Sequence, residues 1–411
     1  MATHRNDPRD EDVAGPLAAL TTLLRRTHLR PPDLLPSAVR EAVGHLDVQA
    51  TVYLADYAQT VLVPMTEAGA PALPVLPIDS TLAGRAYRMV AIQTAAGDDP
   101  HLWMPIIDGV ERLGVLRIAV RDAGDLEDVT FQRECWWFTH YLGHLISVVD
   151  AYGDGIDAIR RQQPRSISAE LVWQLLPPLT AGTDKVLVSG KLEPSSTVGG
   201  DVFDYALSDD TAAFAIFDAT GHDLRSGLAA APALAAYRNS RRQGLGLLEQ
   251  TESVHRAVRD EFAGGMYATG VLGQLDLRTG LLRYLSAGHP PPLLLRDGRV
   301  VKTLDSGHRP LLGREARGAD IAEEALEPGD MIALYTDGIT EARDTEHQFF
   351  GIDRLVDFFE REAAEGTPLT EIVRRVCRRI MSYQNGVLQD DATVLLIQWT
   401  TTGQDLLDPT A

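Results

Sequence analysis

The chain has 411 residues, a formal net charge of −20 and 45% hydrophobic residues, which is an ordinary composition for a globular protein. At roughly 150 residues per domain, this length predicts two domains. The negative charge argues against nucleic acid and anionic membranes as partners, because both need a basic surface, and no apolar run reaches the ~18 residues of a membrane span.

The ends of the chain and its cysteines narrow the class of protein further. Residues 1–16 are polar and we expect them to be disordered, and residues 401–411 form a short acidic tail. No apolar stretch at the N-terminus marks a signal peptide. Cys135 and Cys377 are the only cysteines, so the sequence encodes neither a disulfide framework nor a cysteine-based zinc site. We therefore expect a cytoplasmic protein.

Residues 17–152 show the patterns of a first domain that contains both strands and helices. The stretch VQATVYLA, 48–55, alternates apolar and polar residues as a half-buried strand does. Ser80 is placed to cap the helix of TLAGRAYRMV, and LWMPIIDG and RLGVLRIAV predict two strands around a turn at Asp108-Gly109. In its pattern this module resembles a GAF sensor domain. That resemblance implies an effector, a small molecule or a protein, which the sequence does not identify.

A long helix ends the first domain and carries an apolar stripe. The stripe recurs at steps of three and four residues, at Phe131, Cys135, Phe138, Leu142, Leu145 and Val149. Two interpretations stay open at this point. The stripe packs on the domain's own sheet, or it forms the seam of a parallel coiled coil and makes the protein a homodimer.

Residues 153–180 predict a jointed helical linker between an input domain and an output domain. Glycine and proline interrupt the helical pattern, Ser168 is placed to cap a new helix, and Pro177-Pro178 ends it. A plain surface linker is the alternative.

The sequence pattern of residues 181–400 predicts a second domain, in which strands are joined by tight turns. Helices are predicted over 223–263 and about 350–384, and Pro232 should start or kink a segment of the first. Antiparallel strands with segregated helices imply an α+β sandwich. Hairpin turns are predicted at Asp209-Asp210, Thr279-Gly280 and Asp297-Gly298.

Four short motifs place carboxylates at the ends of predicted strands. Asp218 and Asp337 each follow an apolar strand, and Asp390 and Asp391 come just before the last one. In an antiparallel sheet, the exit of one strand lies beside the entry of its neighbour, so we expect these acids to share one edge. Asp201 follows two glycines, which allow the backbone to approach another group closely.

Crowded carboxylates need a counter-charge, because their mutual repulsion and burial would otherwise cost many kcal/mol. Oxygen ligands without cysteine or patterned histidine select hard cations, Mn²⁺ or Mg²⁺. Two such ions polarise a phosphoryl oxygen and lower the pKa of a bridging water. The motifs therefore predict hydrolysis of a phosphate ester by a metal-bridged water, although each motif alone is also typical of an ordinary turn.

Six segments of the second domain carry a resemblance to a known family. Taken in order, they resemble the PP2C-like (PPM) phosphatases of the bacterial SpoIIE/RsbU type, over about 171–398. The segments are VGGDVFDY, FDATGHD, YATGVLGQLDLRTGLLRYLSAGHPPPLLLRDG, LEPGDMIALYTDGITEARD, FFGIDRLVDFF and QDDATVLLI.

This resemblance implies an α-β-β-α sandwich with a two-metal centre that hydrolyses phosphoserine or phosphothreonine on a protein. The implied substrate is a phosphorylated anti-sigma factor antagonist with a STAS fold. By the family motifs, Asp201, Asp218, Asp337 and Asp390 are the metal-ligating and catalytic acids, and the backbone carbonyl of Ala219 is a further ligand.

Other residues of the second domain have two interpretations each. Asp204 and Asp391 either orient the groups around the metal or only cap and stabilise turns. His222 and His289 either donate a proton to the leaving oxygen or hold local structure, and for His289 we favour holding a strand end.

Two arginine groups, 238–242 and 374–379, are predicted to be mainly solvated helix faces. Docking of the substrate is the alternative for both groups.

The sequence thus predicts a Mn²⁺- or Mg²⁺-dependent protein serine/threonine phosphatase controlled by its N-terminal sensor. Two other functions remain open: a non-catalytic signalling module that binds a partner with the same fold, and a hydrolase of small phosphate esters.

Overall fold

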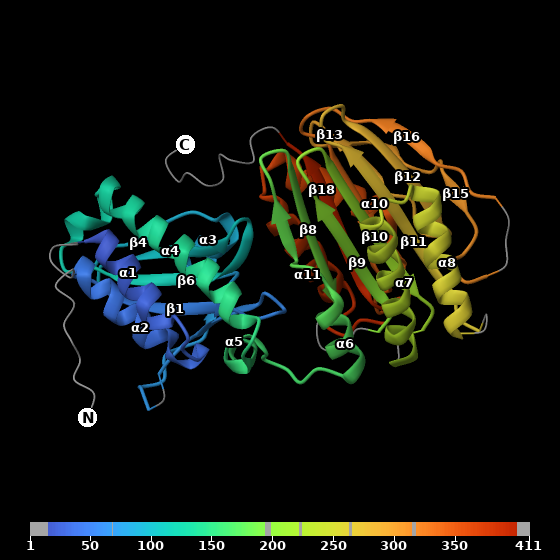
Figure 1. Cartoon of the computed structure of the whole chain (residues 1–411). Helices are drawn as coiled ribbons and strands as arrows, with labels where there is room; N and C mark the ends of the chain where they lie inside the picture. Colours follow the sequence, from blue (N-terminus) through green and yellow to red (C-terminus); the bar gives the residue numbers. More distant parts are fainter. Residues whose placement is uncertain are drawn as a thin grey trace, which may run out of the picture. The chain divides into compact units, whose positions relative to one another are not determined.

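The computed structural model describes residues 15–67, 69–193, 199–221, 224–262, 265–314 and 318–400, and in 224–227 only the backbone. The chain divides into two compact units between Gln162 and Gln163 (Figure 1). The predicted disordered N-terminus lies outside the described ranges except for residues 15 and 16, and the predicted tail lies outside them altogether. None of the helices within these ranges is long and apolar enough to span a membrane.

The first unit is built on one antiparallel sheet with the strand order β3-β2-β1-β6-β5-β4. Helices α1, α2 and α4 share a hydrophobic core with one face of the sheet, and α3 packs against the other face. The strands are β1 Gln49–Ala55, β2 Val61–Pro64, β3 Leu76–Pro77, β4 Gln93–Ala95, β5 His101–Asp108 and β6 Glu111–Ala119. The helices are α1 Pro16–Thr27, η1 Pro32–Leu34, α2 Leu35–Val43, η2 Gly44–Leu46, α3 Leu82–Met89, η3 Ala123–Glu127 and α4 Val129–Asp150.

Two local predictions for this unit need correction. The strand predicted as half-buried is β1, but its last four residues are all buried because α3 covers the face that we expected to be polar. The cap of α3 is Thr81 and not Ser80: the Thr81 hydroxyl accepts a hydrogen bond from the main-chain N–H of Gly84 at 2.9 Å. The GAF resemblance of this unit stays a prediction.

The apolar stripe of α4 packs inside the first unit. Cys135, Phe138, Leu142 and Val149 belong to the core between the helices and the sheet, and none is more than 4% exposed. The interpretation of this stripe as a dimer seam is therefore wrong, because its side chains are already covered. A homodimer stays a prediction without this seam.

The predicted linker is divided between the two units. Helix α5, Asp154–Arg160, places Ile156 in the core of the first unit, and α6, Ile167–Leu175, places Val172 in a core of the second. The cap of α6 is Ser166 and not Ser168, since the Ser166 hydroxyl accepts from the N–H of Ala169.

The second unit contains two sheets that pack face to face. The β10 sheet has the order β15-β12-β11-β10-β9, with β16 beside β12, and the β18 sheet has the order β14-β13-β17-β18-β8-β7. Strands of the β10 sheet are β9 Asp201–Leu207, β10 Thr211–Ala219, β11 Ala268–Asp276, β12 Leu281–Ala287, β15 His308–Arg309 and β16 Ala322–Ala325. Strands of the β18 sheet are β7 Thr180–Gly182, β8 Val186–Glu193, β13 Leu293–Arg296, β14 Arg299–Thr303, β17 Met331–Tyr335 and β18 Ala392–Trp399.

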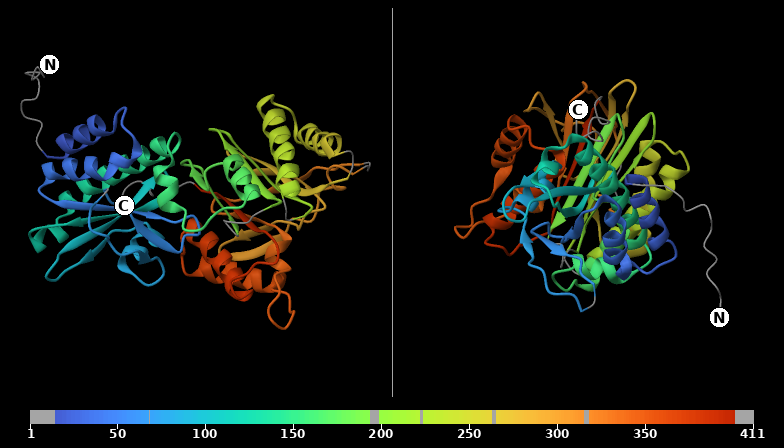
Figure 2. Two further views of the ribbon diagram at one scale, coloured as in Figure 1. Left: turned by 90° about the horizontal axis from the view of Figure 1, so that it is seen from below. Right: turned by 90° about the vertical axis from the view of Figure 1, so that its left-hand side faces the viewer.

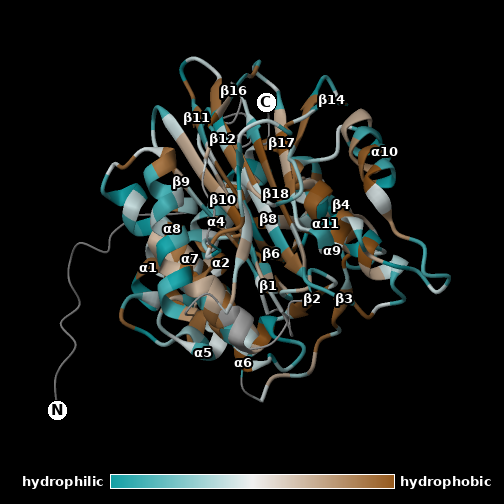
Figure 3. Ribbon diagram, turned by 90° about the vertical axis from the view of Figure 1, so that its right-hand side faces the viewer, coloured by the Kyte–Doolittle hydropathy of each residue, from teal (hydrophilic) through white to brown (hydrophobic). Residues whose placement is uncertain are grey.

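Helices cover the outer faces of both sheets. Helices α6, α7 (Leu224–Arg242) and α8 (Leu247–Phe262) share a core with the β10 sheet. Helices α9 (Asp337–Thr340), α10 (Gly351–Ala364) and α11 (Leu369–Tyr383) share one with the β18 sheet. The left view of Figure 2 shows the helix, sheet, sheet and helix layers in turn, and in Figure 3 apolar residues run along the strands between the helices. The predicted α-β-β-α sandwich is confirmed.

Pro232 lies inside α7 and neither starts nor ends it. The break in the predicted helical segment 223–263 comes later, between Arg242 and Leu247, where Gly244 has a positive φ of 72°. Glycine adopts this conformation without the steric cost that other residues meet.

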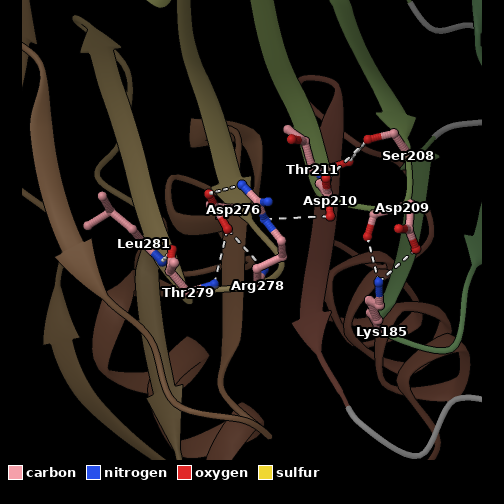
Figure 4. A network of polar contacts seen from close by, with 9 residues as sticks. All are labelled: Lys185, Ser208, Asp209, Asp210, Thr211, Asp276, Arg278, Thr279 and Leu281. Atoms are coloured by element: carbon pink, nitrogen blue, oxygen red, sulfur yellow. Dashed lines mark hydrogen bonds and ion pairs between the residues drawn. The ribbon is translucent and has the colours of Figure 1, made fainter.

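The three predicted hairpin turns are confirmed, and polar side chains hold two of them (Figure 4). After β11, the carboxylate of Asp276 accepts from the main-chain N–H groups of Arg278 and Thr279 at 2.9 and 3.0 Å. After β9, the ammonium of Lys185 donates to the carbonyl and the carboxylate of Asp209 at 2.8 and 2.7 Å.

These turns fix the strand register at the other end of the β10 sheet. Asp218 lies directly opposite Asp201 on β9 and opposite Thr269 on β11. A slip of one residue would turn the Asp218 side chain to the other face of the sheet. The hairpin turns therefore help to determine where this carboxylate lies.

Candidate metal centre

The acidic residues come together at one end of the sandwich, where strands of both sheets end. Asp201 begins β9 and Asp218 lies near the end of β10, and the two are neighbours in the β10 sheet. Asp337 follows β17, and Asp390 and Asp391 precede β18, which pairs with β17. The expectation of one shared sheet edge is therefore wrong, because each of the two sheets contributes two strand ends.

Asp201 is the most deeply held of the acids. Its side chain is 1% exposed, and one carboxylate oxygen, Oδ2, accepts hydrogen bonds from the hydroxyls of Thr336 at 2.8 Å and Thr393 at 2.6 Å. Thr393 lies on β18 and Thr336 directly follows β17 of the same sheet, so these bonds join the two sheets at the acidic end. Burial raises the pKa of Asp201 well above its usual value, and the nearby charges of Asp218 and Asp391 raise it further.

Asp391 holds the loop that leads into β9. Its Oδ2 accepts from the main-chain N–H groups of Gly199 at 2.8 Å and Gly200 at 2.7 Å. A Cβ at Gly200 would lie 2.3 Å from the carbonyl oxygen of Ala219, so only glycine permits this approach of the two strands. Burial raises the pKa of Asp391, while the two N–H donors lower it. The prediction that Asp391 orients the groups of the centre thus gains a physical basis, although no metal tests it.

Gly338, the residue after Asp337, is required by close packing. A Cβ at this position would lie 1.8 Å from the carbonyl oxygen of Asp391. The glycine lets α9 begin directly against the start of β18, and Asp337 is thereby brought beside the Asp390-Asp391 pair.

Asp218 responds to charges from the other sheet. The pKa of Asp218 is raised to about 7, mainly by burial and then by the nearby charges of Asp337, Asp390 and Asp391, in that order. Among the residues that the structure describes, all of these influences on the pKa of Asp218 have the same sign. They favour the protonated carboxyl unless a cation takes the place of the proton.

The centre opens toward solvent on the side of Asp390. Asp337 and Asp218 are partly buried, whereas Asp390 is exposed. Burial raises the pKa of Asp337, and Asp390 and Glu341 raise it further. Exposure thus increases from the buried Asp201, through the partly buried Asp218 and Asp337, to the exposed Asp390.

This donor set fits a hard cation that keeps part of its water shell. Among the described residues, no three His, Cys, Asp or Glu side chains are close enough together to hold an ion by themselves. Mg²⁺ typically takes only one or two protein carboxylates and retains several waters, and Mn²⁺ prefers similar oxygen ligands. The clustered carboxylate oxygens of the described acids agree with such an ion.

Ala219 lies where a main-chain ligand was predicted. It ends β10 directly after Asp218, and its N–H donates to the carbonyl of Gly200 at 3.1 Å. Its role as a carbonyl ligand stays a prediction.

Asp204 anchors helix α7 to the β10 sheet. Its carboxylate accepts from the guanidinium groups of Arg238 at 2.7 Å and Arg241 at 2.8 Å, both on α7. The expectation of a solvated arginine face at 238–242 is therefore wrong for these two residues. In the other group, Arg374 and Arg375 form ion pairs with Glu371 at 2.8 and 3.0 Å, so they too are engaged within the protein.

The structure tests the prediction for only one of the two histidines. His222 lies outside the described residues, so its predicted role is untested. His289 is buried, with Nδ1 2.7 Å from the hydroxyl oxygen of Thr269. It holds the end of a strand, as we favoured.

The sequence analysis did not identify Thr336 and Thr393, which hold the Asp201 carboxylate at the acidic end. Each is a fully buried hydroxyl residue directly beside a predicted acid motif, in YTDG and DDAT. A buried polar side chain needs a partner, so these positions could have signalled contact with a carboxylate.

Comparisons with known proteins point to one family. The family model of Stage II sporulation protein E (SpoIIE) matches residues 208–400, which lie wholly in the second unit. Protein IcfG of Synechocystis sp. is 25% identical over 278 residues, which cover 59% of this chain and 42% of IcfG. Phosphoserine phosphatase RsbU of Bacillus subtilis is 24% identical over 281 residues, which cover 63% of this chain and 79% of RsbU.

A solved structure, the SiaA-PP2C domain of Pseudomonas aeruginosa, is similar with 23% identity and a TM-score of 0.48, over 56% of this chain and 94% of that chain. The chain spans about two fifths of the length of IcfG. The matched segment contains the strand ends that carry Asp218, Asp337 and Asp390. The second unit of this chain is a PP2C-type phosphatase domain of the SpoIIE family.

Proposed function

We propose that this protein is a protein serine/threonine phosphatase that depends on Mn²⁺ or Mg²⁺. The observation that carries the proposal is the meeting of acids from both sheets, whose burial and mutual repulsion raise their pKa values. Asp201, Asp218, Asp337 and Asp390, with the carbonyl of Ala219, are the groups that we assign to two cations. The family match of the domain supports the same chemistry.

Bound ions of this kind would polarise a phosphoryl oxygen and supply a water of lowered pKa. The chain's own residues hold the donors in place. Thr336 and Thr393 fix the inner acid Asp201, and the strand register fixes Asp218 beside it. The exposed position of Asp390 leaves the outer side accessible to a phosphorylated side chain.

The substrate that we propose is phosphoserine or phosphothreonine on a regulatory protein, specifically an anti-sigma factor antagonist with a STAS fold. The similarity to phosphoserine phosphatase RsbU supports phosphoserine as the group that is hydrolysed. We further propose that the first unit is a sensor that controls the domain. The cytoplasmic location and the homodimer stay predictions.

The test is release of phosphate from p-nitrophenyl phosphate and from a phosphorylated STAS protein, with Mn²⁺ or with a chelator. We expect activity with Mn²⁺ only, and a loss in kcat/KM of at least about 100-fold for Asp218→Asn and Asp337→Asn, because each removes an anionic oxygen donor. Asp357→Asn is the matched control, since Asp357 lies on α10 of the same domain and is exposed.

Unchanged rates in Asp218→Asn and Asp337→Asn would refute the proposed centre. Mn²⁺ binding without turnover of either substrate would instead indicate a partner-binding module, and turnover of the small ester alone would indicate a small-ester hydrolase.

A further inference from the structure

A buried histidine lies between the strand ends that carry two of the acids. His289 follows β12 after a turn at Gly288, whose φ is +64°, and its side chain is 6% exposed. The Ser286 hydroxyl donates to the His289 carbonyl at 3.1 Å. The backbone of this residue is thus held by the strand that precedes it.

The imidazole connects to the β10 sheet through Thr269. Nδ1 lies 2.7 Å from the Thr269 hydroxyl oxygen, and Thr269 is the direct partner of Asp218 across β10 and β11. Directly opposite residues of an antiparallel pair present their side chains on the same face. The His289–Thr269 hydrogen bond therefore ends beside Asp218.

The other side of the ring faces the β18 sheet. The main chain of Tyr335 is near enough to favour the protonated form of His289, although Nε2 makes no hydrogen bond of ordinary geometry among the described residues. Tyr335 ends β17, two residues before Asp337. One side chain thus lies between the strand that pairs with Asp218 and the strand that leads to Asp337.

The ring is neutral in this setting, because burial lowers the pKa of His289 to about 3. A neutral imidazole has one N–H and one acceptor nitrogen. In the tautomer with the proton on Nε2, Nδ1 accepts the Thr269 proton. The Thr269 hydroxyl proton is then directed away from Asp218, whose oxygens stay available to a cation.

We propose that His289 is a positioning residue of the metal centre, which acts through Thr269 on Asp218 and through the end of β17 on Asp337. This inference rests on the proposed function, since it takes these acids to be metal ligands. The side chain does not touch the reacting atoms, so its effect is on ion affinity.

Calorimetric titration of the full-length chain with MnCl₂ tests this proposal, with the melting temperature of each metal-free variant measured in parallel. His289→Phe keeps the ring but loses the bond to Thr269, and we expect Mn²⁺ affinity to fall about 10-fold or more. His289→Asn places an amide near the position of Nδ1 and keeps the bond. It leaves a cavity, so we expect a lower melting temperature but Mn²⁺ affinity within about threefold of wild type.

Two further variants complete the design. Thr269→Val removes the same hydrogen bond with little change in volume. It tests the role of this bond in Mn²⁺ binding if His289→Phe does not fold. Thr180→Val is the matched control, because it breaks another buried hydroxyl pair of the domain, Thr180 with Ser189 at 3.3 Å on β7 and β8. We expect wild-type Mn²⁺ affinity in this control.

Three results would overturn the proposal. The first is wild-type Mn²⁺ affinity in His289→Phe or, if that variant does not fold, in Thr269→Val. The second is affinities that simply follow the melting temperatures, which indicates a packing role. The third is a loss of kcat for p-nitrophenyl phosphate at saturating Mn²⁺ with unchanged affinity, which indicates a proton donor. If the wild-type chain does not bind Mn²⁺, the proposed function fails together with this inference, whereas normal wild-type binding with unaffected variants removes the inference alone.

Discussion

Two threonine hydroxyls determine the environment of the innermost acid. Thr336 and Thr393 both donate to the same oxygen of Asp201, and the hydroxyl of Thr336 also accepts from the main-chain N–H of Thr393 at 3.0 Å. The two side chains and the carboxylate thus form one small network. Its members hold Asp201 in one orientation at the junction of the sheets.

Replacing both threonines by valine keeps their volume and removes both donors. We expect Mn²⁺ affinity to fall about 10-fold or more and the free energy of unfolding to fall by about 1–3 kcal/mol per lost bond. The effects of the two single substitutions should not add, because both hydroxyls donate to the same oxygen of Asp201. Calorimetric titration and chemical denaturation measure these changes.

Thr139→Val serves as the control for the threonine pair. Thr139 is equally buried, but its hydroxyl donates to the carbonyl of Trp136 within α4 of the first unit. Wild-type Mn²⁺ affinity in the Thr336→Val, Thr393→Val double variant would contradict the role that we give to this network.

At the scale of elements, the close approach of α9 to β18 depends on one glycine. Because a Cβ at Gly338 would lie 1.8 Å from the carbonyl oxygen of Asp391, Gly338→Ala must move α9 or the start of β18. We expect a loss of phosphatase activity of at least about 100-fold together with a lower melting temperature, since Asp337 and Asp391 both shift.

Gly44→Ala is the matched control for this substitution. Gly44 has an ordinary φ of −58°, and nothing lies within 4 Å of the position of its Cβ. Normal activity in Gly338→Ala would show that the contact between α9 and β18 does not position the acids.

The elements themselves were largely predictable, and their ends less so. Asp297-Gly298 predicts a two-residue hairpin from local chemistry alone, and both residues have the positive φ values that such a turn needs. The caps Thr81 and Ser166 were each missed by one or two residues, because several neighbouring hydroxyl residues suit the role. Pro232 stays inside a helix because packing of α7 on the β10 sheet outweighs the lost hydrogen bond.

For the whole molecule, the clustered acids make the stability of the metal-free protein depend on pH. The pKa of Asp218 is raised to about 7, and those of Asp201, Asp337 and Asp391 are also raised. A carboxyl with a raised pKa contributes stability that is present below its unfolded value, near pH 4, and is lost as the pH rises through the folded value. The metal-free protein should therefore lose stability between about pH 4 and pH 7.

Mn²⁺ should restore this stability by replacing the protons. We expect the rise in melting temperature on adding Mn²⁺ to be larger at pH 8 than at pH 6, as measured by scanning calorimetry, because fewer protons compete at the higher pH. Asp218→Asn should reduce this difference. An equal rise in melting temperature at both pH values in the wild-type chain would contradict the claim that the clustered acids cause the pH dependence.

The gathering of the acids was predictable from their places at strand ends, but their arrangement was not. Sequence patterns show that Asp218 and Asp337 follow buried strands, yet they do not show which strands pair. The structure divides them between two sheets, and the long-range bonds from Thr336 and Thr393 to Asp201 and from Gly199 and Gly200 to Asp391 join the sheets at this end. The stripe of α4 was ambiguous for a similar reason, since periodicity does not identify the surface that covers it.

The central claim is that carboxylates from both sheets hold a hard cation. Anomalous diffraction from crystals of the full-length chain soaked in Mn²⁺ tests it most directly. The account predicts Mn²⁺ peaks in coordination contact with Asp218 and Asp337, with Asp201 or Asp390 completing the site. Peaks elsewhere, or none at this end of the sandwich at saturating Mn²⁺, would contradict it.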